Sequence, residues 1–242
     1  MEILIFFIAH WYLSLFSQTF FHHRYAAHSM FSMSPLWERF FYLFTFITQG
    51  ASYLSPYSYG VLHRMHHANA DTEDDPHSPS YDRNLFSMMW RTKLIYSAIS
   101  KGEKEVAAPY KKDLPDWHNL DRFADKLWVR GTWVLLYSLF YVLFAPHWAF
   151  FLLLPLHFVI GPLHGAIINW FAHKYGYTNY ETKDSSRNLI PFDIIMLGEG
   201  FHNNHHKFQK SPNFGKRWFE FDPVYPVILL LKKLRVIRMN KA

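Results

Sequence analysis

The sequence contains no cysteine among its 242 residues. This absence excludes a disulfide framework, a thiolate zinc site and a cysteine nucleophile. It also excludes a rubredoxin-like or iron–sulfur centre within the chain, because cysteine thiolates hold those centres. Any redox chemistry in this protein therefore uses other side chains or a separate partner.

A disorder-promoting composition is lacking as well. Half of the residues are hydrophobic and a fifth are aromatic, which excludes a disordered or low-complexity protein. The mean hydropathy is only -0.11, but sixteen histidines and many tyrosines lower this average while local windows stay strongly apolar. The length predicts one domain, covering residues 1–242.

Apolar stretches of membrane-spanning length are few. We predict helical spans at about residues 3–21, 127–145 and 148–171, and the last two form a hairpin around the letters "APH". A signal peptide is the alternative for the first stretch, but no basic segment precedes it and no small-residue cleavage site follows it. The sequence therefore predicts an all-α integral membrane bundle.

Two other apolar segments are poorly suited to crossing a membrane. Residues 36–62 begin with Glu38 and Arg39 and contain Pro56, so we predict a half-buried or re-entrant segment there. Residues 224–236 are too short to span and end with basic side chains, which indicates a position at the membrane interface.

Lysine and arginine are absent from residues 1–21 and from the "APH" loop. Twelve of the 25 lie between residues 22 and 126, and another twelve follow residue 171. The positive-inside rule places both basic regions on the cytoplasmic side, with the amino terminus outside and the carboxyl terminus inside. The net charge of +6 suits an anionic membrane surface, whereas nucleic acid is a poor partner for a chain with three lipid-length stretches.

The histidines gather in four clusters on the predicted cytoplasmic side. By chance, a chain with this histidine content would hold roughly 0.07 copies of HxxHH, yet this one holds two. On a helix, positions i, i+3 and i+4 share a face, so each copy presents three imidazoles to one site. The clusters are "HHRYAAH" (22–28), "HRMHH" (63–67), "NWFAH" (169–173) and "HNNHH" (202–206).

The number of candidate ligands indicates two metal ions. His23 and His28 point about 140° apart on an α-helix, which suits two ions better than one. Imidazole suits iron, zinc or copper. Only one Glu-x-x-His motif is present, at Glu199–His202, which disfavours the soluble di-iron carboxylate class. The candidate ligands are His23, His28, His63, His66, His67, Asn169, His173, His202, His205 and His206.

A nearly all-histidine pair of metals in a cytoplasmic helical cap on a lipid-embedded bundle points to oxygen chemistry on a lipid. At these motifs the chain resembles the membrane fatty acid desaturases, most closely the acyl-CoA (stearoyl-CoA desaturase-like) type. "HRYAAH", "HRMHH" and "HNNHH" stand where that family has its three histidine boxes. The likeness extends to "DTEDDPHSP", "INWFAHKYGY" and "GEGFHNNHH" and covers about residues 10 to 220.

The resemblance implies a division of the ligands between two irons. One iron would be bound by His23, His63, His67 and His202, with Asn169 acting through water, and the other by His28, His66, His173, His205 and His206. The implied reaction is the O2-dependent removal of two hydrogens from an unactivated acyl chain, most closely acyl-CoA. No haem or flavin is expected in this chain, so a separate ferredoxin-, rubredoxin- or cytochrome b5-like protein would supply electrons.

Two features depart from the acyl-CoA desaturases. Only about 20 residues precede the first box, which favours a minimal version in a bacterial cytoplasmic membrane, and Tyr59 replaces a typical tryptophan. A phospholipid-linked desaturase and a lipid hydroxylase with the same boxes are the alternative enzymes. A metal-binding membrane protein without activity is the non-enzymatic alternative.

Several other polar residues have two interpretations each. A stripe that recurs every four residues is predicted to pack against other helices, and an acidic segment with His77 either forms a third metal site or orients ligand imidazoles, as Glu199 would. Gln49 either touches substrate or caps a turn. The stripe comprises His10, Ser14, Gln18 and His22, and the acidic segment comprises Asp71, Glu73, Asp74 and Asp75.

Overall fold

The computed structural model describes residues 1–240, so the last two residues of the predicted domain lie outside the described part of the chain. The fold is mostly helical, with one small antiparallel sheet of β1 (Phe31–Met33) and β2 (Ile237–Met239). The α-helices are α1 (Glu2–Phe16), α2 (Pro35–Gln49), α3 (Pro56–Asn69), α4 (Leu85–Ser100), α5 (Ala108–Lys111), α6 (His118–Ala124), α7 (Leu127–Phe144), α8 (Leu154–Phe158), α9 (Ile160–Ala166), α10 (His202–Lys207) and α11 (Val224–Lys233). Two π-helical segments, η1 (Ser17–Ala27) and η4 (Ile167–Phe171), and two 3-10 segments, η2 (Gly50–Ser52) and η3 (Trp148–Leu153), extend or join these helices.

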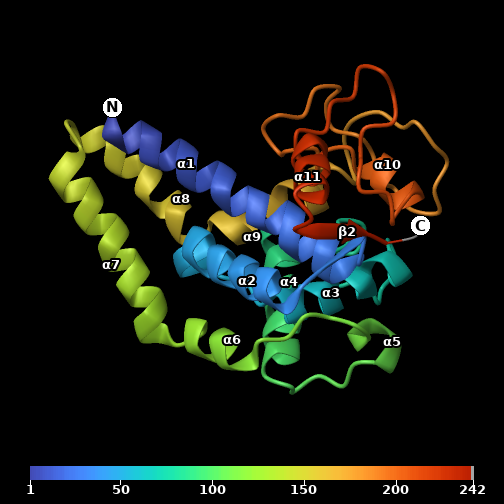
Figure 1. Ribbon diagram of the computed structural model, residues 1–242, viewed down its shortest axis with the longest axis horizontal. Coiled ribbons are helices and arrows are strands. Elements are labelled where there is room, and N and C mark those ends of the chain that lie inside the picture. The colour runs from blue at the N-terminus through green and yellow to red at the C-terminus, as the bar shows by residue number, and fades with distance from the viewer. Residues whose placement is uncertain (241–242) are drawn as a thin grey trace.

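Within residues 1–240, two helices are long and apolar enough to cross a membrane. The first is the continuous helix Glu2–Ala27, made of α1 and η1, and the second is α7. Leu4, Ile5 and Ile8 leave apolar side chains exposed along α1, as a lipid-facing surface requires. Figure 1 shows the start of α1 beside the connection between α7 and α8, at the end of the bundle away from α10.

The third apolar stretch, predicted as one span, is a broken helix. The pair Trp148–Phe158 and Ile160–Phe171 is bent by 74°. Pro162 explains the break, because its ring clashes with the carbonyl four residues earlier, at Phe158, and it has no N–H to donate there. The described part of the chain therefore has two candidate spans, or three if the bent pair crosses as one.

Residues 36–62 fold back on themselves as α2, a turn and α3 (Figure 1). The fifteen residues of α2 rise about 22 Å, which is less than the hydrocarbon core of about 30 Å. Gly50 adopts a φ of 49° after α2, in the left-handed region that favours glycine. The Gln49 side-chain oxygen accepts a hydrogen bond from the Leu54 N–H at 3.0 Å, so Gln49 caps this turn.

The core beside η1 fixes the carboxyl-terminal end of the first long helix. Phe20, Phe21 and Phe201 belong to one buried apolar cluster that reaches from η1 to α11. Arg24 is fully buried on η1, and its guanidinium donates to Asp222 at 2.7 Å and to the Pro212 carbonyl at 3.1 Å. These contacts tie η1 to the carboxyl-terminal third of the chain, which carries α10.

Candidate metal centre

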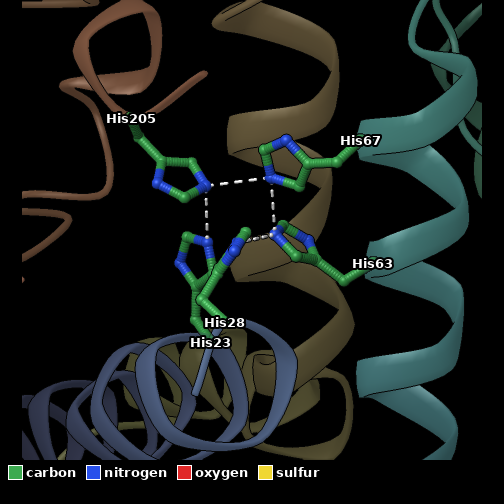
Figure 2. A group of neighbouring side chains, drawn as sticks. All are labelled: His23, His28, His63, His67 and His205. Atoms are coloured by element: carbon green, nitrogen blue, oxygen red, sulfur yellow. Dashed lines mark hydrogen bonds between the residues drawn. The ribbon is translucent and has the colours of Figure 1, made fainter. Parts of the chain in front are cut away.

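Five imidazoles from three segments distant in sequence meet in a first group. The Nε2 atoms of His63 and His67 lie 2.9 Å apart, and His28 Nε2 lies 2.9 Å from that of His63. His205 Nε2 lies 2.9 Å from His67 Nε2 and 3.0 Å from His23 Nε2. Figure 2 shows these rings turned toward a common centre from η1, α3 and α10.

Four further imidazoles form a second group directly beside the first, and all four are buried. His173 Nε2 lies 3.0 Å from His202 Nε2, and His66 Nε2 lies 3.4 Å from His206 Nε2. The rings of His67 and His206 are 4.5 Å apart between centroids, so the two groups are neighbours. The structure thus brings together all nine histidines that the sequence analysis selects.

The π-helical form of η1 groups these histidines differently from the division of ligands that the resemblance implies. The His28 N–H donates to the His23 carbonyl at 3.1 Å, which is the i to i+5 bond of a π-helix. This wider turn puts both side chains on one face, with ring centroids 5.0 Å apart. His28 therefore belongs to the first group with His23, and the separation of about 140° for an α-helix is wrong here.

The two HxxHH motifs also divide differently from the prediction. On α10, His202 and His206 face the second group, with rings 4.3 Å apart, while His205 faces His23 in the first. On α3, His63 and His67 join the first group and His66 joins the second. Each motif therefore contributes to two adjacent groups. The side chains at i+3 and i+4 point to opposite sides of the side chain at i, so they do not meet at one point.

The donor set fits metal ions. Burial lowers the pKa of His63, His67 and His205 well below its usual range, and neighbouring imidazoles lower it further, so these rings are neutral near pH 7. A neutral imidazole whose proton lies on Nδ1, toward a carboxylate, presents a bare Nε2 lone pair on its other side. His66 and His206 are both placed in this way, with Nε2 atoms 3.4 Å apart, and a cation between two such lone pairs removes their repulsion. An all-imidazole shell suits iron, zinc or copper.

Carboxylates contact the Nδ1 atoms of three of the rings, on the side away from the group centre. This arrangement is common at metal sites, where it orients the ligand and raises its basicity. The Nδ1 atoms of His23, His66 and His206 lie 2.6 Å from Glu199, 3.0 Å from Asp75 and 2.8 Å from Asp184. Burial would raise the pKa of Asp75, but its hydrogen bond with His66 and the nearby imidazoles together outweigh burial and lower it. Sequence reasoning missed Asp184, which stands outside every histidine motif.

The acidic segment supports the second group. Besides Asp75, Asp71 has a carboxylate oxygen 3.6 Å from His173 Nδ1, whereas Glu73 and Asp74 are exposed. His66, Asp75 and His77 also lie close enough together to hold an ion. Since His66 turns Nδ1 toward Asp75 and Nε2 toward His206, we interpret this trio as the outer support of the second group.

The polar stripe on the first long helix packs inside the bundle. His10 Nδ1 lies 2.5 Å from His157 Nδ1, and His22 Nε2 lies 2.8 Å from the Leu54 carbonyl oxygen. Ser14 and Gln18 are buried as well. The stripe therefore contacts other helices, as the sequence predicts.

An apolar cavity of about 450 Å³ ends at the two groups. His23 and His63 of the first group and His202 of the second line its inner end, together with Asn169 on η4. Its walls come from α1, α3, α4 and α9 and their continuations; they include Leu15, Leu62, Phe86, Met89, Trp90 and Ile168. An apolar cavity that reaches candidate metal ligands suits a long aliphatic substrate.

The sequence matches the family model of the fatty acid desaturases over residues 2–231. The chain belongs to the fatty acid desaturase family. Named members of this family are desaturases, which are oxidoreductases, and the histidine groups fit the metal use of such enzymes.

Curated relatives include desaturases with different printed substrates. The sn-1 stearoyl-lipid 9-desaturase of Anabaena variabilis is 28% identical over 218 residues, which cover 88% of this chain and 74% of that protein. The icosanoyl-CoA 5-desaturase of Limnanthes douglasii is 30% identical over 214 residues, covering 88% of this chain and 57% of that protein. The Delta-9 desaturase-like 4 protein of Arabidopsis thaliana is 27% identical over 229 residues, covering 93% and 71%.

Proposed function

We propose that this protein introduces a double bond into a fatty acyl chain, using O2 and two iron ions. The observation that carries the proposal is the apolar cavity that ends at both histidine groups. The proposed ligands of one iron are His23, His28, His63, His67 and His205, with Asn169 acting on it through water, and those of the other iron are His66, His173, His202 and His206.

In the proposed reaction, two neighbouring CH2 groups each lose one hydrogen and become a CH=CH pair. O2 takes up these two hydrogens with two protons and two electrons from outside, and two waters form. Bound iron would supply the activation of O2. The chain's own residues position the substrate, because the cavity walls confine the aliphatic chain and exclude water beside His63 and His202.

Two carriers of the acyl chain are candidates. Acyl-CoA is the first, because the motifs resemble the acyl-CoA desaturases and the Limnanthes relative carries a CoA ester in its name. A lipid-linked chain is the second. It is favoured by the name of the Anabaena relative and by Phe86 and Trp90, which line the cavity yet stay exposed, as at a lipid surface.

The proposed setting is one desaturase domain in a bacterial cytoplasmic membrane, with the metal centre on the cytoplasmic side. The distribution of Lys and Arg supports this orientation, because none lies in residues 1–21 or in the loop before Trp148. A separate electron carrier completes the reaction, since the chain has no cysteine to hold a cluster of its own.

Product analysis tests the function and the carrier together. Purified protein loaded with iron would be reduced with dithionite without air, freed of excess dithionite, and then given O2 with either stearoyl-CoA or vesicles of a stearoyl phospholipid. We expect a monounsaturated product from one of these substrates, only with O2 and with iron near two per chain. Hydroxylated product would establish the hydroxylase alternative, and activity restored by zinc but not by iron would contradict the redox function.

A further inference from the structure

The metal centre has a second opening. A pocket of about 620 Å³ lies where the end of η1, α3, α5 and the segment after α10 meet, and His28 and His67 line it. These two rings are the partly exposed members of the first group, while the second group is buried throughout. The pocket and the apolar cavity share no lining residue, so two separate openings reach the metal centre.

This second pocket is basic, unlike the apolar cavity. Its charged side chains are three cations, Arg64, Lys112 and Lys210, and one carboxylate, Asp113. Arg64 is fixed beside the rings, because its guanidinium donates to the carbonyls of Ala27 at 2.7 Å and Lys112 at 2.5 Å. Lys112 and Lys210 are exposed at the rim.

The reaction requires an electron source that reaches this centre from outside. Electron transfer weakens steeply with distance, so a carrier has to approach the ligand rings that lie nearest to the surface, and these are His28 and His67. Complementary charge steers such encounters and raises their rate, and redox interfaces are usually small. A basic pocket over two ligand imidazoles fits an acidic protein.

We propose that a one-electron carrier protein with an acidic surface docks over the pocket of Arg64, Lys112 and Lys210, next to His28 and His67. This inference rests on the proposed function. Two reduced carriers are each oxidised by one electron per turnover, and these two electrons, with two protons and the two hydrogens of the acyl chain, reduce O2 to two waters. Substrate enters by the other opening, so donor and acyl chain do not compete.

Direct binding tests the docking site. Iron-loaded protein in lipid nanodiscs is titrated with plant-type ferredoxin and, separately, with the soluble domain of cytochrome b5, at low and high salt. We expect at least one probe to bind, with an affinity that falls as salt rises. The double variant Lys112→Glu and Lys210→Glu should raise the Kd about tenfold or more, since it places like charges at the interface.

The matched control is the double variant Lys101→Glu and Lys104→Glu. It makes the same charge change at exposed positions outside the pocket, and it should bind the probe as the wild type does. All proteins are compared at equal iron content. Unchanged probe binding by the pocket variant, or no binding of either probe by the wild type, would overturn the docking site.

Two further results separate this inference from related failures. If the pocket variant bound the probes normally but lost affinity for stearoyl-CoA, the pocket would be a phosphate site and the inference would be wrong. If the wild type formed no product with dithionite, the proposed function itself would fail. Product with dithionite but no carrier binding would refute the docking site alone.

Discussion

His22 and His23 are adjacent in sequence but differ in surroundings. His23 Nε2 faces His205 in the first group while its Nδ1 meets Glu199. His22 instead contacts the Leu54 carbonyl and lies beside the ring of Tyr59. The two side chains point about 100° apart on a regular helix, and the π-helix keeps them in different environments.

We therefore predict opposite effects for two alanine variants. His23→Ala should lose iron from the first group and nearly all desaturation, because a missing ligand changes both affinity and redox tuning. His22→Ala should keep its iron and cost about 1 kcal/mol of stability, since the half-buried Leu54 carbonyl loses its partner. Bound iron, thermal unfolding and unsaturated product are measured at equal expression. Iron loss in His22→Ala with retention in His23→Ala would refute this ligand assignment.

At the scale of helices, α9 sets the width of the apolar cavity. Gly165 lines that cavity, and a Cβ added there would lie 3.9 Å from the Asn169 side-chain nitrogen, an ordinary contact. A leucine therefore fits the backbone but extends into the space for the acyl chain. Gly131 on α7 offers a control, because a Cβ there meets nothing within 4 Å among the described residues.

Gly165→Leu should bind iron normally but lower product formation about tenfold or more, because overpacking a filled cavity costs about 1–3 kcal/mol. A shorter acyl chain should suffer less than stearoyl, which separates a blocked cavity from a damaged metal centre. Gly131→Leu should match the wild type in iron and product. Equal loss for all chain lengths in Gly165→Leu would contradict the placement of the substrate in this cavity.

Helix periodicity selects the histidines that the fold brings together, but it does not predict how they are grouped. The residue types and spacing select all nine histidines and indicate the Glu199 and Asp75 contacts. They do not reveal that residues 17–27 form a π-helix, because that depends on packing around Arg24 and Phe20, far from the motif in sequence. The contact of Asp184 with His206 cannot be predicted from the motif either, because only tertiary folding brings its carboxylate 2.8 Å from His206 Nδ1.

The bend in the third apolar stretch also depends on tertiary packing, which the sequence pattern does not show. Hydropathy reports the length and polarity of a stretch, so it predicts residues 148–171 as one span. It contains no information on a change in the direction of the helix axis. Pro162 indicates a possible break in the helix, but it does not require one, because many membrane helices contain a proline whose freed carbonyl is hydrogen-bonded by neighbouring groups. Here Gly161 packs against η2, where its N–H donates to the Ser52 hydroxyl at 3.1 Å, and this contact accompanies the 74° bend.

For the whole molecule, the arrangement of charge and helices predicts how the protein sits in the membrane. The start of α1 and the loop before Trp148 lie at one end of the bundle, and α10 and α11 lie at the other (Figure 1). The first end carries no Lys or Arg, while Lys104 and Lys210 belong to the basic regions. The positive-inside rule therefore places Glu2 and His147 outside and both lysines in the cytoplasm.

The absence of cysteine makes this orientation directly testable. Four single variants, Glu2→Cys, His147→Cys, Lys104→Cys and Lys210→Cys, each carry one thiol in an otherwise thiol-free chain. In intact cells, a membrane-impermeant maleimide should label the first two, and it should label the last two only after permeabilisation. Labelling of His147→Cys and Lys210→Cys from the same side would mean that the bent pair Trp148–Phe171 turns back instead of crossing. The basic pocket and the loop before Trp148 would then share one side, and the positive-inside argument for a cytoplasmic metal centre would fail.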